Sequence, residues 1–180
     1  MREIMSTQNI IDLIKGHADG KNYLEIGVFR GGMLLEVAKV AKTAIGIDNF
    51  SQFDNGQNKE AVLGKIQGFD NCKLIEGDCF DSKVKKKVKN KSIDVYFYDG
   101  DHTAKATEKA IVEYAPKLKD KAILIIDDWN HNPAMIGTDK ALYKLQSEFS
   151  FKPIFQKFTF KNASPDWWNG IAVFELTRNK

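Results

Sequence analysis

The stretch Glu25-Ile26-Gly27-Val28-Phe29-Arg30-Gly31-Gly32 decides the fold class of this 180-residue chain. It begins within a short apolar run, residues 23–26, and leads into a segment whose apolar residues have helical spacing. A glycine-bearing turn between a buried strand and a helix lets a ligand approach the backbone, because glycine has no Cβ atom. We therefore expect a nucleotide-type binding loop at this point.

Four more apolar runs of the same kind follow along the chain. All five are short and rich in β-branched and aromatic residues, which is typical of parallel strands buried on both faces. They cover residues 23–26, 44–47, 73–75, 93–98 and 122–126. Segments with helical spacing lie between them, including one with Ala61, Val62 and Ile66. This alternation predicts an α/β fold, a doubly wound sheet with helices on both faces.

The two ends of the chain depart from this alternation. A helix with Ile4, Ile10, Ile11 and Ile14 is predicted within residues 1–20, and another near residues 134–149. Residues 151–160 and 171–176 are strand-like runs joined without a helix, which predicts an antiparallel hairpin at the sheet edge. The result is a Rossmann-like, seven-stranded sheet.

One domain is expected over residues 1–180, because domains commonly hold about 100–150 residues. Its predicted parts are the N-terminal helix (1–20), a nucleotide-binding half (22–130) and a helix plus edge hairpin (131–180).

Composition excludes several other classes of protein. With 43% hydrophobic and 28% charged residues, the chain has ordinary globular composition rather than that of a disordered or fibrous protein. A net charge of +3 is too small to indicate nucleic acid or membrane as a partner. Cys72 and Cys79 are too few for a disulfide framework or a zinc site. No signal peptide or membrane-length apolar run occurs, so we expect a cytoplasmic protein.

The lysine-rich run 82–91 has two interpretations. Val84 and Val88 lie four residues apart, which fits a surface helix with a solvated lysine face. Nucleic-acid binding is the alternative, and the surface helix is favoured.

Acidic residues follow the first three predicted strands, where ligands of such sheets bind. Glu25 repels a phosphate and suits a cation, and the glycine spacing is not the dinucleotide fingerprint. Asp48 has the position of a ribose-binding acid, and Asp78 can accept from an adenine amino group. Each acid alone is equally explained as a cap or turn residue. Together, a ribose, a base and a cationic remainder describe S-adenosylmethionine better than NAD.

The ordered set Glu25-x-Gly27-x-x-x-Gly31, Asp48 and Gly77-Asp78, with acids after the fourth strand and a late hairpin, resembles the class I S-adenosylmethionine-dependent methyltransferases. The resemblance covers residues 22–176. It implies cofactor contacts from Glu25, Gly27, Gly31, Asp48, Asn49, Asp78, Cys79 and Asp99.

Two further turns, Tyr98-Asp99-Gly100-Asp101-His102 and Ile126-Asp127-Asp128-Trp129-Asn130, follow the fourth and fifth predicted strands. Neighbouring parallel strands bring these turns together, and clustered carboxylates repel one another unless they are protonated or hold a cation. Oxygen ligands suit Mg²⁺. The sequence therefore predicts a magnesium site.

These turns resemble the metal-dependent O-methyltransferases, in particular the branch that includes macrocin O-methyltransferase and the cephalosporin-biosynthesis methyltransferase. The resemblance implies that Asp99, Asp127 and Asp128 bind the metal, that His102 is the general base, and that Asp99 is also a catalytic residue. Catechol-type relatives have an Asp-Asn pair in place of Asp127-Asp128. The acceptor is therefore expected to be a small hydroxylated molecule, a sugar, polyol or natural product.

Several alternatives stay open at this point. His102 is also suited to cap the helix that starts near Thr103. Trp129 is expected to wall the acceptor pocket, whereas Trp167 and Trp168 are equally explained by the pocket and by packing. The short loops leave room for a second copy of the chain to complete the pocket, so a homo-oligomer is one prediction. A metal-independent methyltransferase and a non-catalytic nucleotide-binding module are the competing functions.

Overall fold

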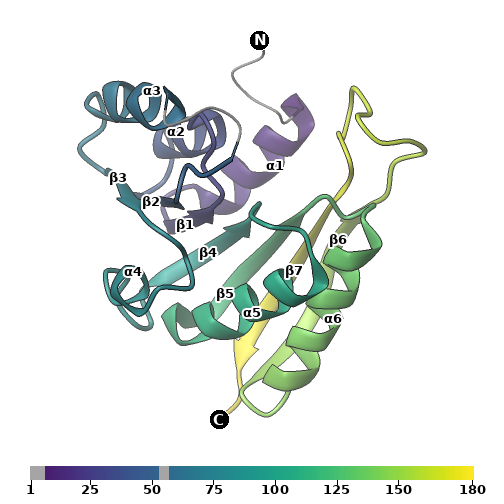
Figure 1. The fold of residues 1–180 in the computed structure, drawn as a ribbon. Helices are drawn as coiled ribbons and strands as arrows, with labels where there is room; N and C mark the ends of the chain where they lie inside the picture. The colour runs from purple at the N-terminus through teal and green to yellow at the C-terminus, as the bar shows by residue number, and fades with distance from the viewer. Residues whose placement is uncertain (1–6, 53–56) are drawn as a thin grey trace.

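A sheet with helices on both faces forms the centre of the protein (Figure 1). The computed structural model describes residues 7–52 and 57–180, and within them the sheet has seven strands in the order β3-β2-β1-β4-β5-β7-β6. The first five strands pair in parallel, whereas β7 is antiparallel to both β5 and β6. The predicted doubly wound sheet with an antiparallel edge hairpin is confirmed.

The strands lie close to their predicted positions. Their bounds are β1 Asn22–Ile26, β2 Thr43–Asp48, β3 Cys72–Glu76, β4 Ile93–Tyr98, β5 Leu118–Asp127, β6 Phe149–Lys157 and β7 Ile171–Arg178. The helices are α1 Gln8–Ala18, α2 Gly32–Ala38, α3 Gln57–Ile66, α4 Ser82–Lys85, α5 Ala104–Tyr114 and α6 Asn132–Leu145, with a 3₁₀ turn at Ala115–Lys117.

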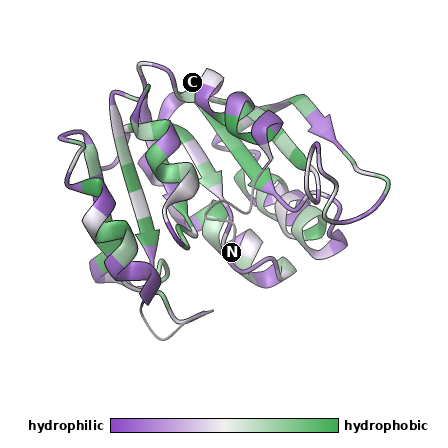
Figure 2. Ribbon diagram, turned by 90° about the horizontal axis from the view of Figure 1, so that it is seen from above, coloured by the Kyte–Doolittle hydropathy of each residue, from purple (hydrophilic) through white to green (hydrophobic). Residues whose placement is uncertain are grey.

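Alternate residues of each central strand enter two separate cores. In β4, Tyr96 and Tyr98 face the core that α5 and α6 cover, and Val95 and Phe97 face the core that α1 and α2 cover. All four are at most 1% exposed. Figure 2 shows the same division, with apolar residues along the strands and polar residues on the outer sides of the helices. Burial on both faces explains why these strands are continuous apolar runs in the sequence.

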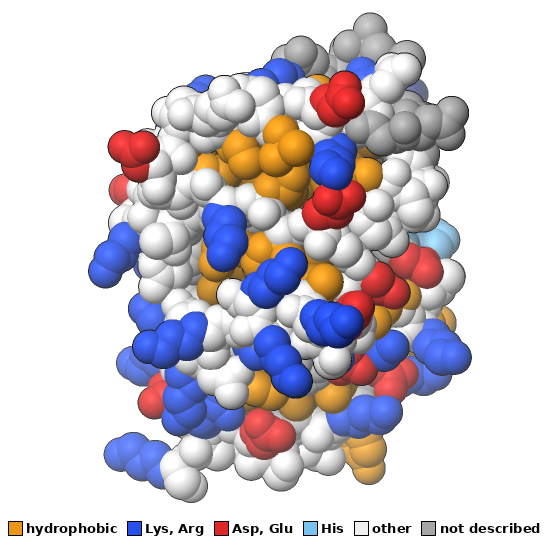
Figure 3. Space-filling model, turned by 60° about the vertical axis from the view of Figure 1, so that its left-hand side comes forward, with side chains coloured by type: hydrophobic (Ala, Val, Ile, Leu, Met, Phe, Trp, Pro, Cys, Tyr) orange, Lys and Arg blue, Asp and Glu red, His pale blue; other side chains and the backbone are white. Residues whose placement is uncertain are grey.

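The predicted lysine-faced helix is wrong in its length. The helix α4 spans only one turn, and Lys87 N and Val88 N then bond to Val84 O and Lys85 O in tight three-residue steps. Val84 and Val88 are nonetheless buried, since both turns press them onto the core. Lysines gather on this face of the molecule (Figure 3). None of the described helices has the length and apolar composition needed to cross a bilayer.

Three other expectations need correction or fall outside the described residues. Ala61 is exposed, so of the three apolar residues expected on the inner side of α3 only Val62 and part of Ile66 lie there. The last helix begins at Asn132, two residues early, and ends at Leu145 because Phe149 already starts β6. Ile4 of the predicted N-terminal helix lies outside the described residues.

The helices α5 and α6 approach each other closely at Gly137. A Cβ atom there would lie 2.5 Å from Ala104 O and 2.7 Å from Thr107 Cβ. We expect Gly137→Ala to lower the free energy of unfolding by about 1–3 kcal/mol, the usual cost of overpacking.

Gly64→Ala is the matched control, because no atom lies within 4 Å of the added Cβ on α3. It should raise the free energy of unfolding by about 0.5–1 kcal/mol through helix propensity. Urea unfolding followed by circular dichroism measures both. Equal effects of the two substitutions would contradict this packing.

Candidate active site

A cavity of about 330 Å³ opens at the carboxyl ends of β1, β2, β4 and β5. Its position is the point where the strand order reverses between β1 and β4, where open α/β sheets bind ligands. Six acidic side chains line it and, apart from His102, no basic side chain of the described residues does. The acids are Glu25, Asp48, Asp99, Asp101, Asp127 and Asp128.

The glycine loop after β1 is held against the turn after β4. Gly27 has φ +93°, and a Cβ atom there would lie 1.9 Å from Asp99 O. Gly27 N donates to Ile47 O at 3.0 Å, and Asp99 N donates to Ile26 O at 2.9 Å. Only glycine permits this approach, because both the backbone conformation and the space exclude a side chain. Gly27 therefore lines the cavity with bare backbone.

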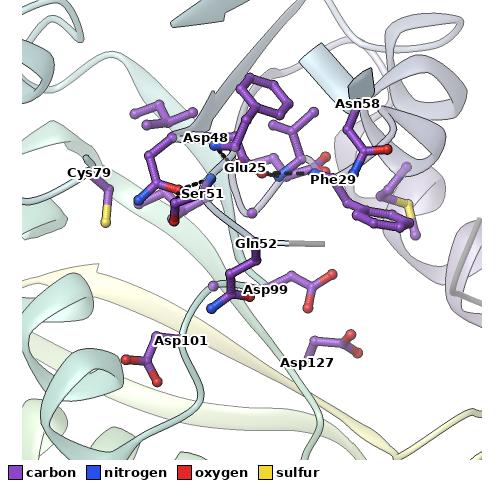
Figure 4. Close-up of a pocket in the computed structure, with 18 of the residues that line it drawn as sticks. Glu25, Phe29, Asp48, Ser51, Gln52, Asn58, Cys79, Asp99, Asp101 and Asp127 are labelled. Carbon is purple, nitrogen blue, oxygen red and sulfur yellow. Dashed lines mark hydrogen bonds between the residues drawn. The ribbon is translucent and has the colours of Figure 1, made fainter. Parts of the chain in front are cut away.

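The Asp48 carboxylate is engaged by backbone groups. Its Oδ2 accepts from Val28 N at 2.7 Å and Phe29 N at 2.8 Å, and its Oδ1 accepts from Phe50 N at 2.7 Å (Figure 4). Asp48 thus fixes the shape of the glycine loop, a role that the sequence did not reveal. Oδ2 thus uses both of its lone pairs, whereas Oδ1 has one left for a ligand. Asp48 also lines the cavity.

Glu25 lies at the inner end of the cavity and is only 1% exposed. Its Oε2 accepts from the hydroxyl of Tyr23 at 2.9 Å, which is itself fully buried. Burial raises the pKa of Glu25 well above its usual value, and the charges of Asp99 and Asp48 raise it further. A carboxyl group held in this way gains most from a ligand with a positive charge.

The turn after β3 contributes less than expected. Gly77 and Cys79 line the cavity, but Asp78 is exposed and its Oδ1 accepts from Phe80 N at 2.8 Å. Gly31 is the N-cap of α2 with φ +78°, and its neighbour Gly32 lines the cavity instead.

Asp99, Asp127 and Asp128 come together where the neighbouring strands β4 and β5 end. Asp99 and Asp127 lie within hydrogen-bonding reach of each other. His102 Nε2 lies 3.4 Å from Asp99 Oδ1 and 3.7 Å from Asp128 Oδ2. The predicted convergence of the two turns is present in this geometry.

These acids have strongly shifted pKa values. The enclosed position of Asp99 raises its pKa to about 8, with a contribution from the charge of Asp128. Burial raises the pKa of Asp127 well above its usual value, and Asp99 and Asp128 add to the shift. Asp127 Oδ1 is buried and has no hydrogen-bond partner among the described residues. These shifts show that the cluster favours bound protons or a bound cation over bare negative charge.

His102 does not cap the helix α5. Thr103 is the N-cap, and its hydroxyl accepts from Ala106 N at 3.3 Å. His102 instead lines the cavity, and its buried Nδ1 has no hydrogen-bond partner in the described part of the chain. Its imidazole is therefore available to groups in the cavity.

The expectation for Trp129 is wrong. Trp129 is 4% exposed and packs on Phe174, with ring centroids 5.7 Å apart, instead of lining the cavity. The tryptophan that lines the cavity, together with Phe29 and Phe50, is Trp168, which has φ +47° and comes from the loop between β6 and β7. Strain of this kind in a residue that faces a cavity is a frequent sign of function.

Comparison with known proteins identifies the family. The model of a family described as a methyltransferase domain matches residues 24–129, more than half of the chain. The chain belongs to this methyltransferase family. It is a methyltransferase that depends on S-adenosylmethionine. The matched segment runs from β1 to the turn after β5 and so includes every acid of the cavity.

Solved structures share the methyltransferase fold. A protein from Corynebacterium glutamicum is 12% identical with a TM-score of 0.69, over 97% of this chain and 83% of that one. An O-methyltransferase from Bacillus cereus in complex with SAH is 16% identical with a TM-score of 0.64, over 93% and 78%. An rRNA methylase from Streptococcus thermophilus is 14% identical with a TM-score of 0.59, over 95% of both chains. No curated protein matches the sequence.

Some residues of this methyltransferase cavity carry no motif in the sequence. Ser51 and Gln52 lie in the loop after β2, and Asn58 is 3% exposed on α3. Arg30 Nε donates to Asn58 Oδ1 at 2.7 Å, which fixes the Asn58 amide. The sequence signal available for Asn58 was its polar side chain on the inner side of α3, where apolar residues are expected.

The raised pKa of Glu25 makes a prediction for this methyltransferase. Proton binding to the folded state stabilises it below the ordinary pKa, and this contribution is lost as pH rises through the raised pKa. Glu25→Gln should therefore raise the melting temperature of the ligand-free protein at pH 8 and have little effect near pH 4. The same substitution should weaken S-adenosylmethionine binding about ten-fold, because a charge-assisted hydrogen bond is lost.

Glu36→Gln is the control of opposite sign, because Lys39 and Lys15 lower the pKa of Glu36. The stability that the ionised Glu36 carboxylate contributes is present above its ordinary pKa and is lost as pH falls through the lowered pKa. Glu36→Gln should therefore be less stable than the wild type at pH 8. Thermal melts at several pH values, with calorimetry for the donor, measure these effects. A stability difference for Glu25→Gln that does not change with pH would contradict the assignment.

Proposed function

We propose that the whole chain, residues 1–180, acts as one Mg²⁺-dependent O-methyltransferase domain that methylates a hydroxyl group of a sugar, polyol or similar natural product. The observation that carries the proposal is one cavity with two different ends. One end has the glycine loop and Glu25, and the other has three carboxyl groups around His102.

The glycine-loop end is the proposed donor site. Glu25 accepts a hydrogen bond from the donor's ammonium group, and its negative charge favours a sulfonium compound over a phosphate. The free lone pair of Asp48 Oδ1 and the side chain of the neighbouring Asn49 receive the ribose hydroxyls. The adenine lies beside Gly77 and Cys79, with Asp78 at the rim.

The three clustered carboxyl groups, those of Asp99, Asp127 and Asp128, have the chemistry that a divalent cation requires. Carboxylate oxygens are the ligands that Mg²⁺ prefers, and the unpartnered Oδ1 of buried Asp127 is a ready acceptor. Asp99, Asp127 and Asp128 are the proposed ligands. No three His, Cys, Asp or Glu side chains in the described residues are already placed as a metal cage. His102 lies between Asp99 and Asp128, so loading requires a side-chain adjustment there.

A bound Mg²⁺ would lower the pKa of an acceptor hydroxyl and so make it a better nucleophile. His102 Nε2 takes the hydroxyl proton, and the neighbouring carboxylate of Asp99 stabilises the imidazolium that results. The acceptor oxygen forms a bond with the methyl carbon as the carbon–sulfur bond breaks. Trp168 excludes water and supports one face of the acceptor ring.

The acceptor class is proposed from the Asp127-Asp128 pair and from Trp168. This pair is the feature shared with the branch that includes macrocin O-methyltransferase, and an aromatic wall beside carboxylates suits a hydroxylated ring. The similarity to an O-methyltransferase in complex with SAH is consistent with oxygen as the methylated atom. A metal-independent methyltransferase is the second candidate, favoured by the lack of a ready-made metal cage in the described residues.

Calorimetric titration tests the proposal. The protein should bind S-adenosylmethionine at micromolar concentrations and take up Mg²⁺, which EDTA then removes. No binding of the donor at tens of micromolar would end the methyltransferase assignment to this cavity. Donor binding without any uptake of Mg²⁺ or Mn²⁺ would favour the metal-independent alternative.

The predicted ligand Asp127 gives a sharper test. Asp127→Asn should abolish uptake of the metal and leave the affinity for S-adenosylmethionine within about two-fold, because Asp127 ends β5, two strands away in the sheet from β1, which carries Glu25. Asp139→Asn, an exposed carboxylate on α6, is the control and should change neither. Unchanged metal affinity in Asp127→Asn would remove Asp127 from the proposed site.

A further inference from the structure

The loop that joins β6 to β7, residues 158–170, is folded back onto the turn after β5. Trp129 N donates to Gly170 O at 3.2 Å, and Asn130 N donates to Asn169 O at 2.8 Å. The Asn130 side chain also accepts from Thr159 N at 2.9 Å. Within the loop, Ser164 and Trp168 exchange two backbone hydrogen bonds of 2.9 Å. The loop is therefore a defined element that can transmit a contact.

One side chain of this loop reaches the acidic cluster. Asn169 Nδ2 donates to Asp128 Oδ1 at 2.9 Å, and Asn169 Oδ1 accepts from Ala163 N at 2.7 Å. The amide thus joins the loop to Asp128, whose other oxygen faces His102 Nε2 at 3.7 Å. Asp128 has φ +52°, a conformation that is unfavourable for a residue with a side chain. Its orientation accordingly depends on contacts from outside its own turn.

We propose that Asn169 is a positioning residue for Asp128, and that it couples the cation site to the loop that carries Trp168 of the acceptor wall. The inference rests on the proposed function in one respect, because it takes Asp128 as a cation ligand. It adds a residue outside the family match, which ends at residue 129.

Hydrogen-bond geometry explains the effect. With Oδ1 held by the Asn169 amide, the Asp128 carboxylate keeps Oδ2 near His102 Nε2, which also lies close to Asp99 Oδ1. Residues that hydrogen-bond to a metal-binding carboxylate hold it in the orientation that the metal needs. Their loss typically lowers metal affinity about 10–100-fold. The coupling is reciprocal, so a cation at Asp128 stabilises the loop by the same free energy. An acceptor that contacts Trp168 then meets a loop that the cation has already ordered.

Mn²⁺ binding, measured by electron paramagnetic resonance in the presence of S-adenosylhomocysteine, tests the positioning role. Asn169→Ala should lower the Mn²⁺ affinity about ten-fold or more. Its affinity for S-adenosylhomocysteine should equal that of the wild type, because Asn169 lies outside the donor end of the cavity. Asn162→Ala, an exposed residue of the same loop without a side-chain hydrogen bond in the described residues, should leave both affinities unchanged.

A second variant separates positioning from loop folding. Thr159→Val removes the hydroxyl that bonds to Lys161 O and Trp168 O but leaves the Asn169–Asp128 contact in place. It should keep most of the Mn²⁺ affinity. An equal loss in Thr159→Val and Asn169→Ala would overturn the positioning role, because loosening of the loop alone would then explain both.

Hydrogen exchange tests the coupling. Mg²⁺ should slow the exchange of amides in residues 159–169 of the wild type and have no such effect in Asn169→Ala. An identical response in both proteins, or unchanged Mn²⁺ affinity in Asn169→Ala, overturns the inference while leaving the proposed function intact. A wild-type protein that binds no Mn²⁺ overturns the metal dependence and this inference together.

Discussion

The contact between Gly27 and the backbone of Asp99 is the constraint on which the rest of the site depends. A Cβ atom at Gly27 would lie 1.9 Å from Asp99 O, so the two turns can meet only through a glycine. Their meeting sets the distance between the glycine loop, shaped by Asp48, and the acids that follow β4 and β5. A donor and an acceptor bound in one cavity need such a fixed distance, because methyl transfer requires the reacting atoms in line.

The cavity concentrates negative charge at a cost in stability. Six acids line it although the whole chain has a net charge of +3, and the lysines gather on outer surfaces such as the face of α4. Burial and mutual repulsion raise the pKa values of Glu25, Asp99 and Asp127. Each of these groups would be better solvated elsewhere, so their placement favours binding of cations over stability of the free protein. The sulfonium donor and a divalent metal are ligands of the matching charge.

The sequence predicts the sheet well because strands buried on both faces leave an unambiguous apolar pattern, as in Ile93–Tyr98. The placement of Asp99 and Asp127 at one end of a cavity also follows from sequence, since parallel strands end at the same edge. Local spacing fails where tertiary contacts decide. Val84 and Val88 fit a helix, yet the chain there makes tight turns. Nothing local distinguishes the buried Trp129 from the partly buried cavity residue Trp168.

A crystal structure with S-adenosylhomocysteine and Mn²⁺, using the anomalous signal of manganese, tests the central claim that one cavity holds the donor and a metal at its two ends. The account predicts the amino group of the ligand beside Glu25 and a manganese peak at coordination distance from oxygens of Asp99, Asp127 and Asp128. A ligand bound outside the cavity, or a manganese ion absent from these three carboxylates, would contradict it.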